Sequence, residues 1–210
     1  MFNIKSYQYK LDNWKLKKQK LNEIIDKINF YQDKNSNLLT NYGNDNNYEA
    51  DVIQILKEDI NKFFIDANLY NPCVSSLWFQ QYNNEQCHLT HNHGALGYSS
   101  VLYVNYDAKH HTATRFLSPY YSVTGETITY VPIVDEGTLL VFPSMINHYT
   151  LPNQSQKTRT ILSINFKENR KNYSLSSSFF SSSFSFINSS QAAIPPLNSK
   201  IFLSQFCITC

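Results

Sequence analysis

Three histidines and one arginine are the residues of this chain whose types and spacing best suit chemistry. His91 and His93 stand two positions apart, His148 follows 55 residues after His93, and Arg159 comes eleven residues later. Neutral imidazole nitrogen binds iron, zinc, copper or nickel. Arginine can hold a carboxylate through two parallel hydrogen bonds. The combination predicts a metal ion beside a bound organic acid.

The spacing of the histidines fits a β structure. Residues i and i+2 of a strand point to the same face, so His91 and His93 can project together from one strand or its end. We expect His148 to come from a later strand, because it follows a turn and the apolar segment 138–142. Three protein ligands on one face leave coordination positions open, and catalysis needs open positions.

Arg159 is the first residue of a segment that we expect to form a strand, with alternate side chains on opposite faces. In that segment one face would carry Arg159, Ile161, Ser163 and Asn165. An arginine buried there without a partner would be costly. A bound carboxylate would satisfy it.

The other three histidines are expected not to bind the metal. His88 lies three positions before His91, which would place it on the opposite strand face. His110 and His111 fall in an expected turn. We expect all three to be exposed or to lie behind the ligands.

The spacing of apolar residues divides the chain into an N-terminal part with helical periodicity and a later part with strand periodicity. Apolar residues recur at helical spacing over 10–31 and 49–67, and the Asn- and Asp-rich segment 33–48 between them predicts a loop. Strand patterns follow at 76–82, 98–106, 112–117, 126–133, 138–142 and 158–166. Two helices followed by many short strands predict an α+β chain whose working part is a β-sandwich or barrel.

The predicted organisation has three parts. Residues 1–70 form an N-terminal helical segment that packs on the β-domain, 71–168 form the β-core, and 169–210 form a tail rich in Ser and Phe. No charged residue lies between Lys171 and Lys200. Because this low-complexity composition suits neither a charged linker nor a packed strand, we expect a poorly ordered C-terminal tail.

At these residues the chain resembles the iron(II)/2-oxoglutarate-dependent oxygenases, and within them a phage-type branch. The resemblance runs from about Asn13 to Phe166. Asn13-Trp14-Lys15 resembles the N-terminus of that branch, and His91–Val104 resembles its metal-binding strand and the next one. The pieces that resemble its closing segment are Gly137–Pro143, His148, Pro152-Asn153 and Arg159.

The resemblance implies a double-stranded β-helix (jelly roll) after the two helices, one Fe(II), and 2-oxoglutarate as co-substrate. It implies that 2-oxoglutarate chelates the metal and that O2 is cleaved, with release of CO2 and succinate and hydroxylation of a C–H bond. The metal ligands would be His91, His93 and His148. Arg159 would bind the far carboxylate of 2-oxoglutarate, with Tyr103 as a second contact. No pattern in the chain specifies the primary substrate.

The chain departs from the family's pattern at two positions. Most of the wider family has Asp or Glu where this chain has His93. A third neutral ligand leaves one less negative charge on the iron and would shift its redox potential, and Asp107 is the alternative ligand. The wider family often has Ser or Thr two residues after the arginine, where this chain has Ile161. Ser163, one step deeper on the same face, is then the expected co-substrate contact.

Two other functions compete with this interpretation. The first is a cupin-like metal dioxygenase that needs no 2-oxoglutarate. The residues spaced somewhat like a second cupin motif are Gly137, Pro143, His148 and Asn153. Leu96 and Gly97, however, stand where cupins usually place a metal-binding Glu. The second is a non-catalytic jelly-roll module with a structural or binding role, such as part of a phage particle. Iron uptake together with 2-oxoglutarate turnover distinguishes all three.

The composition limits the kinds of partner and the cellular location that we expect for this protein. With 18 Lys and Arg against 16 Asp and Glu, the formal net charge of +2 lacks the basic footprint of a nucleic-acid-binding protein. No run of about 18 apolar residues predicts a membrane span, and residues 1–30 show no secretory signal. The four cysteines lack the spacing of a disulfide framework. We therefore expect a cytoplasmic location, in the host cytoplasm if the protein is viral.

Overall fold

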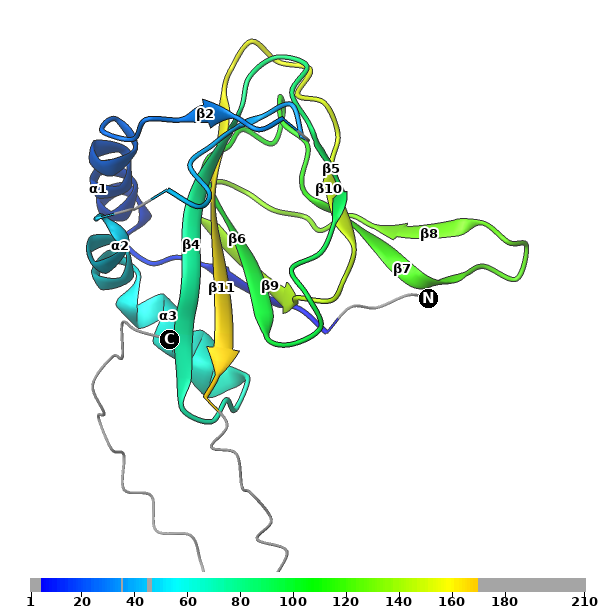
Figure 1. Cartoon of the computed structure of the whole chain (residues 1–210), viewed down its shortest axis with the longest axis horizontal. Helices are drawn as coiled ribbons and strands as arrows, with labels where there is room; N and C mark the ends of the chain where they lie inside the picture. The colour runs from blue at the N-terminus through cyan, green and yellow to red at the C-terminus, as the bar shows by residue number, and fades with distance from the viewer. Residues whose placement is uncertain (1–4, 35, 45–46, 170–210) are drawn as a thin grey trace, which may run out of the picture.

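Two antiparallel β-sheets and three helices make up the computed structural model, which describes residues 5–34, 36–44 and 47–169 (Figure 1). The larger sheet contains, in spatial order, β1 (Tyr7–Lys10), β9 (Thr138–Pro143), β6 (Tyr98–Asn105), β11 (Arg159–Glu168), β4 (Pro72–Tyr82), β3 (Leu39–Thr40) and β2 (Tyr31–Gln32). The smaller sheet contains β5 (His88–His91), β10 (His148–Thr150), β7 (Arg115–Tyr121) and β8 (Thr127–Tyr130). Strands far apart in sequence thus pair side by side, as expected for a double-stranded β-helix, and the predicted α+β jelly roll is confirmed.

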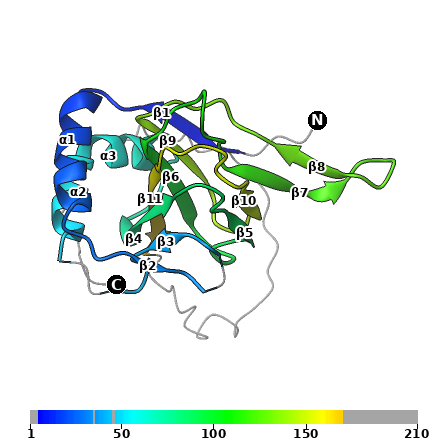
Figure 2. The same ribbon diagram turned by 90° about the horizontal axis from the view of Figure 1, so that it is seen from above.

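The helices lie together against one face of the larger sheet (Figure 2). They are α1 (Trp14–Ile25), α2 (Glu49–Ile55) and α3 (Lys57–Asp66). Buried helix residues, Leu21 and Phe63 among them, share one apolar cluster with Phe79, Leu102 and Leu162 of the sheet. Since the helices cover this face, the opposite face of the sheet is left to meet the smaller sheet.

Alternation along the strands divides the interior into two clusters. Leu102 and Leu162 belong to the cluster beneath the helices, whereas their neighbours Tyr103 and Ile161 belong to a second cluster. Phe116, on β7 of the smaller sheet, joins that second cluster. Because successive strand residues point to opposite faces, β6 and β11 pack against the helices on one side and the smaller sheet on the other.

The predicted elements are present with some changes. The two expected helices lie at their predicted places, but the second is divided at Leu56, where φ is −102° and ψ is 8°. The segment 33–48, predicted as a loop, contributes β3 to the larger sheet. Pro119 lies within β7. The pairing of β7 with β8 is irregular between Leu117 and Tyr121, and such an irregularity tolerates a residue without a backbone N–H.

The predicted division of the chain stays a proposal. Residues 1–70, expected as a helical segment, also supply β1, β2 and β3 to the larger sheet. The predicted tail at 169–210 lies, from residue 170 on, outside the described residues. Among the described residues, none of the helices has the length and hydropathy that a membrane crossing requires.

The N-terminal segment packs closely against the β-core at Gly137. This glycine has a φ of +77°, and a Cβ added to it would lie 2.6 Å from the Trp14 ring. The Trp14 indole donates a hydrogen bond to Glu136 (3.2 Å), which also forms an ion pair with Lys18 (2.7 Å). Only glycine therefore allows α1 to pack this closely on the turn before β9.

Candidate active site

The structure brings the three predicted metal ligands together. His91 ends β5, His93 follows it, and His148 begins β10. These two short strands are paired, with His91 opposite His148. One ligating nitrogen from each of the three rings lies within 4.8 Å of the other two, and the Nε2 atoms of His93 and His148 are 3.3 Å apart. Since metal–imidazole bonds are about 2.0–2.1 Å long, one metal ion can be bound by all three rings.

Backbone carbonyl groups orient two of the rings. Nδ1 of His91 donates to the carbonyl of Leu89 (2.8 Å), and Nδ1 of His148 donates to that of Ile146 (2.9 Å). Each bond fixes the neutral tautomer in which Nε2 carries the free lone pair. Such hydrogen bonds commonly orient histidines that bind metals. The two rings are therefore prepared for a metal on their Nε2 side.

Burial keeps the three imidazoles neutral. It lowers the pKa of His93 to about 4, with a smaller contribution from the neighbouring His91. It also lowers the pKa of His91 and holds that of His148 well below its usual range. Neutral imidazole is the form that binds a metal, so no proton has to leave these rings near pH 7.

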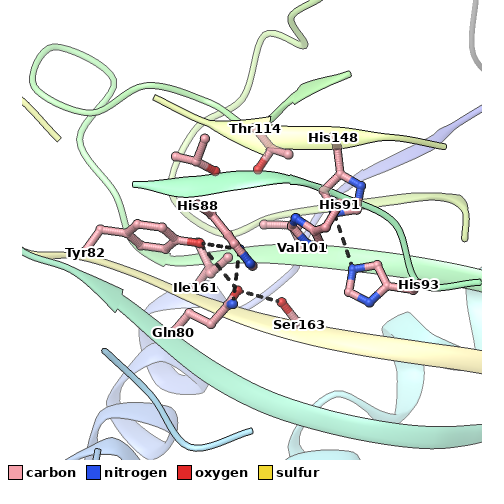
Figure 3. Close-up of a pocket in the computed structure, with 11 residues that line it drawn as sticks. Gln80, Tyr82, His88, His91, His93, Val101, Thr114, His148, Ile161 and Ser163 are labelled. Carbon is pink, nitrogen blue, oxygen red and sulfur yellow. Dashed lines mark hydrogen bonds between the residues drawn. The ribbon is translucent and has the colours of Figure 1, made fainter. Parts of the chain in front are cut away.

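His88 lines the same pocket, and its predicted place on the opposite face is wrong. Its ring stacks on His91 with centroids 3.8 Å apart, and its Nδ1 lies 3.4 Å from Nε2 of Gln80 and 3.5 Å from the Tyr82 hydroxyl (Figure 3). The reason is a bulge in which Thr150 pairs with His88. A bulge breaks simple alternation and can turn residues three apart toward one side.

Asp107, the alternative ligand, lies outside the histidine cluster. Its carboxylate accepts hydrogen bonds from Lys157 (2.9 Å) and from His110 (2.6 Å). Within the described part of the chain, the only group of side chains placed to hold a metal is the three histidines. The carboxylate of Asp107 thus has partners elsewhere.

His111 has a structural position in the interior, not the exposed one that we considered. Its Nε2 donates to the carbonyl of Lys157 (3.0 Å), and its Nδ1 accepts from the backbone N–H of Asp107 (3.0 Å). Only 7% of its surface is exposed. His111 therefore joins two loops and has no part in the metal cluster.

Arg159 is a buried cation with unused hydrogen-bond donors. It is 1% exposed, and its Nη2 donates to Oγ1 of Thr114 (3.3 Å), but its Nε and Nη1 have no partner. The rings of Tyr82 and Tyr103 flank the guanidinium, with centroids 4.6 and 5.6 Å from its central carbon. A buried charge without an anionic partner is costly, and a carboxylate would supply that partner.

The two other predicted co-substrate contacts lie nearby. The hydroxyl of Tyr103 accepts a hydrogen bond from the backbone N–H of Thr114 (3.1 Å), and its ring lies beside Arg159. Ser163 lines the pocket and donates to Oε1 of Gln80 (3.2 Å). Ile161 lines it too, so the predicted shared face of Ile161 and Ser163 is present.

Sequence reasoning missed several residues of this pocket. They are Gln80, Tyr82, Val101, Thr114 and Thr150. Alternation within the predicted strand 76–82 would have placed Gln80 and Tyr82 on one face, but nothing in the sequence identified that face as the one toward the metal.

The space among these side chains is small. It amounts to about 10 Å³, close to what one water molecule needs. Among the described residues, no Asp or Glu lines the pocket. Figure 3 shows His88 between Tyr82, whose ring covers Arg159, and His91. The donors fit a metal and an organic acid, and side chains such as His88 must shift to admit the acid.

Comparison with known proteins agrees with this geometry. The family described as "Putative 2OG-Fe(II) oxygenase" matches residues 76–165, which include all three histidines and Arg159. The matched segment has the fold and function of a 2-oxoglutarate/Fe(II) oxygenase. The family match favours this function over the cupin-like and non-catalytic alternatives. A search of curated protein sequences found no match.

Several solved structures have a similar fold at low sequence identity. A prolyl-4-hydroxylase from Pseudomonas putida is 16% identical, with a TM-score of 0.55 over 79% of this chain and 94% of that one. The viral collagen prolyl hydroxylase of Paramecium bursaria Chlorella virus-1 is 15% identical, with a TM-score of 0.52 over 77% and 96%. HygX from Streptomyces hygroscopicus, solved with nickel and 2-oxoglutarate, is 7% identical, with a TM-score of 0.62 over 80% and 84%. These likenesses establish the fold.

The oxygenase uses Fe(II) as its metal and 2-oxoglutarate as its co-substrate. Both requirements fit the residues present. Three neutral imidazoles suit Fe(II), and Arg159 offers buried N–H groups to a carboxylate.

Proposed function

We propose that this oxygenase hydroxylates a C–H bond of its substrate through a site made of His91, His93, His148 and Arg159. The overall reaction would convert substrate, O2 and 2-oxoglutarate into hydroxylated substrate, succinate and CO2, with one oxygen atom of O2 in the alcohol and the other in succinate. The observation that supports this most is the buried Arg159, with two unpaired donors, in the sheet that faces the histidine cluster.

In this proposal the three histidines hold the metal through neutral nitrogens. Bound Fe(II) and 2-oxoglutarate supply the activation of O2. The carbonyl groups of Leu89 and Ile146 keep two of the rings in the tautomer that binds metal. Three protein ligands leave positions for a chelating co-substrate and for O2.

Arg159 would bind the far carboxylate of 2-oxoglutarate. Its Nε and Nη1 are the free donors, and Thr114 holds the third nitrogen in place. Tyr103 fixes Thr114 through its hydroxyl, while Tyr82 covers one face of the guanidinium and keeps water away. Ser163, already bonded to Gln80, would contribute a hydroxyl beside the co-substrate.

An anaerobic titration tests this site. The metal-free protein receives Fe(II) and then 2-oxoglutarate, and the visible charge-transfer band of the chelate is recorded. We expect the band in the wild type. In Arg159→Ala we expect bound iron at the wild-type ratio but an affinity for 2-oxoglutarate at least about tenfold lower, because a buried charge-assisted pair is worth about 1.5–3 kcal/mol.

Arg115→Ala is the matched control, because Arg115 is only partly buried and its neighbour on β7, Phe116, points into the interior, so Arg115 points to the opposite face. It should keep the wild-type affinity for 2-oxoglutarate. An Arg159→Ala protein with unchanged affinity would remove Arg159 from the proposed site. Tight Fe(II) binding without any band in the wild type would contradict the 2-oxoglutarate chelate itself.

We further propose that the chain belongs to a phage-type branch of these enzymes. Support comes from Asn13-Trp14-Lys15, whose tryptophan packs against Gly137 of the closing segment. The near-balanced formal charge of +2 supports a substrate other than nucleic acid.

We also propose a cytoplasmic location, because an enzyme that requires ferrous iron suits a reducing compartment. If the protein is viral, this is the cytoplasm of the host.

A further inference from the structure

His93 is held differently from the other two histidines of the cluster. His91 ends β5 and His148 begins β10, and each ring donates from Nδ1 to a backbone carbonyl. His93 lies two residues beyond the end of β5, at the end of the pocket away from Tyr82 (Figure 3). Among the described residues, no Nδ1 bond to a carbonyl orients its ring. Other contacts must therefore position this ligand.

The backbone of Ser144 holds the segment that carries His93. The N–H of His93 donates to the carbonyl of Ser144 (2.9 Å), and the N–H of Ser144 donates to the carbonyl of Gly97 (3.1 Å). Both ends of the segment 93–97 are thus bonded to one residue. Ser144 follows β9 directly and is 3% exposed. The position of His93 therefore depends on how firmly Ser144 itself is anchored.

The side chain of Ser144 begins a series of hydrogen bonds across the larger sheet. Its Oγ lies 2.8 Å from Oγ of Ser99, which donates to Oδ1 of Asn165 (2.8 Å). Nδ2 of Asn165 then donates to Oγ of Ser76 (3.1 Å). A hydroxyl has one hydrogen, and Ser99 uses its hydrogen on Asn165, so Ser144 is the donor in the first bond. All the bonds therefore run in one direction, from the segment of His93 into the sheet.

This series of bonds ends on rigid structure. Ser99 is 1% exposed and pairs with Asn165 across β6 and β11, and Asn165 pairs with Ser76 across β11 and β4 (Figure 1). Strand β11 has a partner on each side and also carries Arg159. A buried polar group that loses its partner is costly, which favours the fully bonded arrangement. The bonds thus connect the segment of His93 to the strand of Arg159.

We propose that the hydrogen-bonded series Ser144, Ser99, Asn165 and Ser76 positions His93 as the third metal ligand, with Ser99 as its central residue. Ser99 does not touch the metal and acts through Ser144. This inference rests on the metal site of the proposed function. It assigns a role to polar side chains of the larger sheet that lie outside the pocket around the metal.

Cobalt(II) is the probe for this role. Imidazole nitrogen binds Co(II) as it binds Fe(II), and the visible d–d bands of Co(II) report the number and arrangement of its ligands. The full chain, free of metal and without 2-oxoglutarate, is titrated anaerobically with Co(II), and affinity and spectrum are recorded. His93→Ala provides the spectrum of the site without its third ligand.

Ser99→Ala breaks the series of bonds at its centre. Its Co(II) affinity should be about tenfold lower or more, because loss of a group that orients a metal ligand typically costs about 10- to 100-fold. Its d–d spectrum should move toward that of His93→Ala.

Ser100→Ala is the matched control. Ser100 is the next residue of β6, is 2% exposed, and donates to the carbonyl of Ile164 (3.2 Å) on the other face of the strand. Each variant removes one buried hydroxyl from β6, so both should lower the urea midpoint of the metal-free protein. Only Ser99→Ala should change the metal site, and Ser100→Ala should keep the Co(II) spectrum of the wild type.

The outcomes separate the two proposals. Co(II) affinity and spectrum that stay unchanged in Ser99→Ala, or change equally in Ser100→Ala, overturn the positioning role and leave the metal site intact. A wild type that binds no Co(II), or a His93→Ala protein with the wild-type spectrum, overturns the proposed ligand set and this inference together. If Ser99→Ala does not fold, Ser144→Ala removes the first hydroxyl of the series and carries the same expectations.

Discussion

At the scale of single residues, His88 shows how a side chain outside the metal ligand set can shape the pocket. It stacks on His91 and reaches Gln80 and Tyr82, so its ring lies between the histidine cluster and the tyrosine that covers Arg159. Burial lowers its pKa to about 3, which keeps it neutral. A neutral ring gives the co-substrate no charge to bind, yet it occupies space.

Removing this ring should therefore help the co-substrate. In His88→Ala we expect an affinity for 2-oxoglutarate at least about threefold higher, a change of about 0.7 kcal/mol, because less has to move on binding. The anaerobic chelate titration measures it. Leu89→Ala, at an exposed neighbouring position, is the control. A weaker affinity in His88→Ala would show instead that His88 contributes a contact to the co-substrate.

At the scale of elements, short paired strands and loop contacts hold the site residues in place. The bulge between β5 and β10 turns His88 and His91 to one side. His111 joins the loop after β6 to the loop before β11 through Asp107 and Lys157. Its Nδ1 accepts a backbone N–H, and it would lose this bond on taking up a proton.

His111 should make the stability of the fold depend on pH. The pKa of His111 is lowered below the ordinary value of about 6.5, and burial is the largest cause of this shift. The unfolded chain therefore binds the proton more readily than the folded protein does. The contribution of neutral His111 to the stability of the fold is complete above pH 6.5 and is lost as the pH falls below 6.5. Between pH 7.5 and 5.5, the free energy of unfolding should fall by up to about 1 kcal/mol more in the wild type than in His111→Asn.

Urea unfolding of metal-free protein at the two pH values measures this difference. His110→Asn is the control, because His110 is an exposed neighbour. An identical loss of stability in the wild type and His111→Asn would mean that protonation of His111 does not oppose folding.

At the scale of the whole molecule, the helices brace the sheet from the face opposite the site (Figure 1). Trp14 of α1 packs on Gly137 of the β-core, next to the ion pair of Lys18 with Glu136. The turn at Gly137 leads directly into β9, a central neighbour of β6. Damage to this junction should therefore weaken the fold as a unit.

Gly137→Ala should lower the free energy of unfolding by at least about 2 kcal/mol. The positive φ alone costs about 1–2 kcal/mol for a residue with a Cβ, and the added methyl group would also collide with the Trp14 ring. Gly125→Ala is a matched control, since Gly125 has a φ of +81° and nothing within 4 Å of the added Cβ. Equal losses for the two variants in urea unfolding would exclude a contribution from packing on Trp14.

The sequence alone determined the residue types of the site and the kind of elements that hold them. The pair His91 and His93, the distant His148 and the opening residue of the last strand, Arg159, could be recognised because strand alternation and ligand chemistry are local properties. The run of short strands predicted a β-sandwich or barrel, and the family resemblance implied a jelly roll, which is confirmed.

Only the tertiary structure decided how these residues meet. A bulge placed His88 beside His91, and strands of two to four residues, such as β5 and β10, are too short for a periodic signal. Among the described residues, two donors of Arg159 have no hydrogen-bond partner, and the rings of Tyr82 and Tyr103 enclose its guanidinium. Such burial depends on pairing between distant segments, which local sequence patterns do not encode.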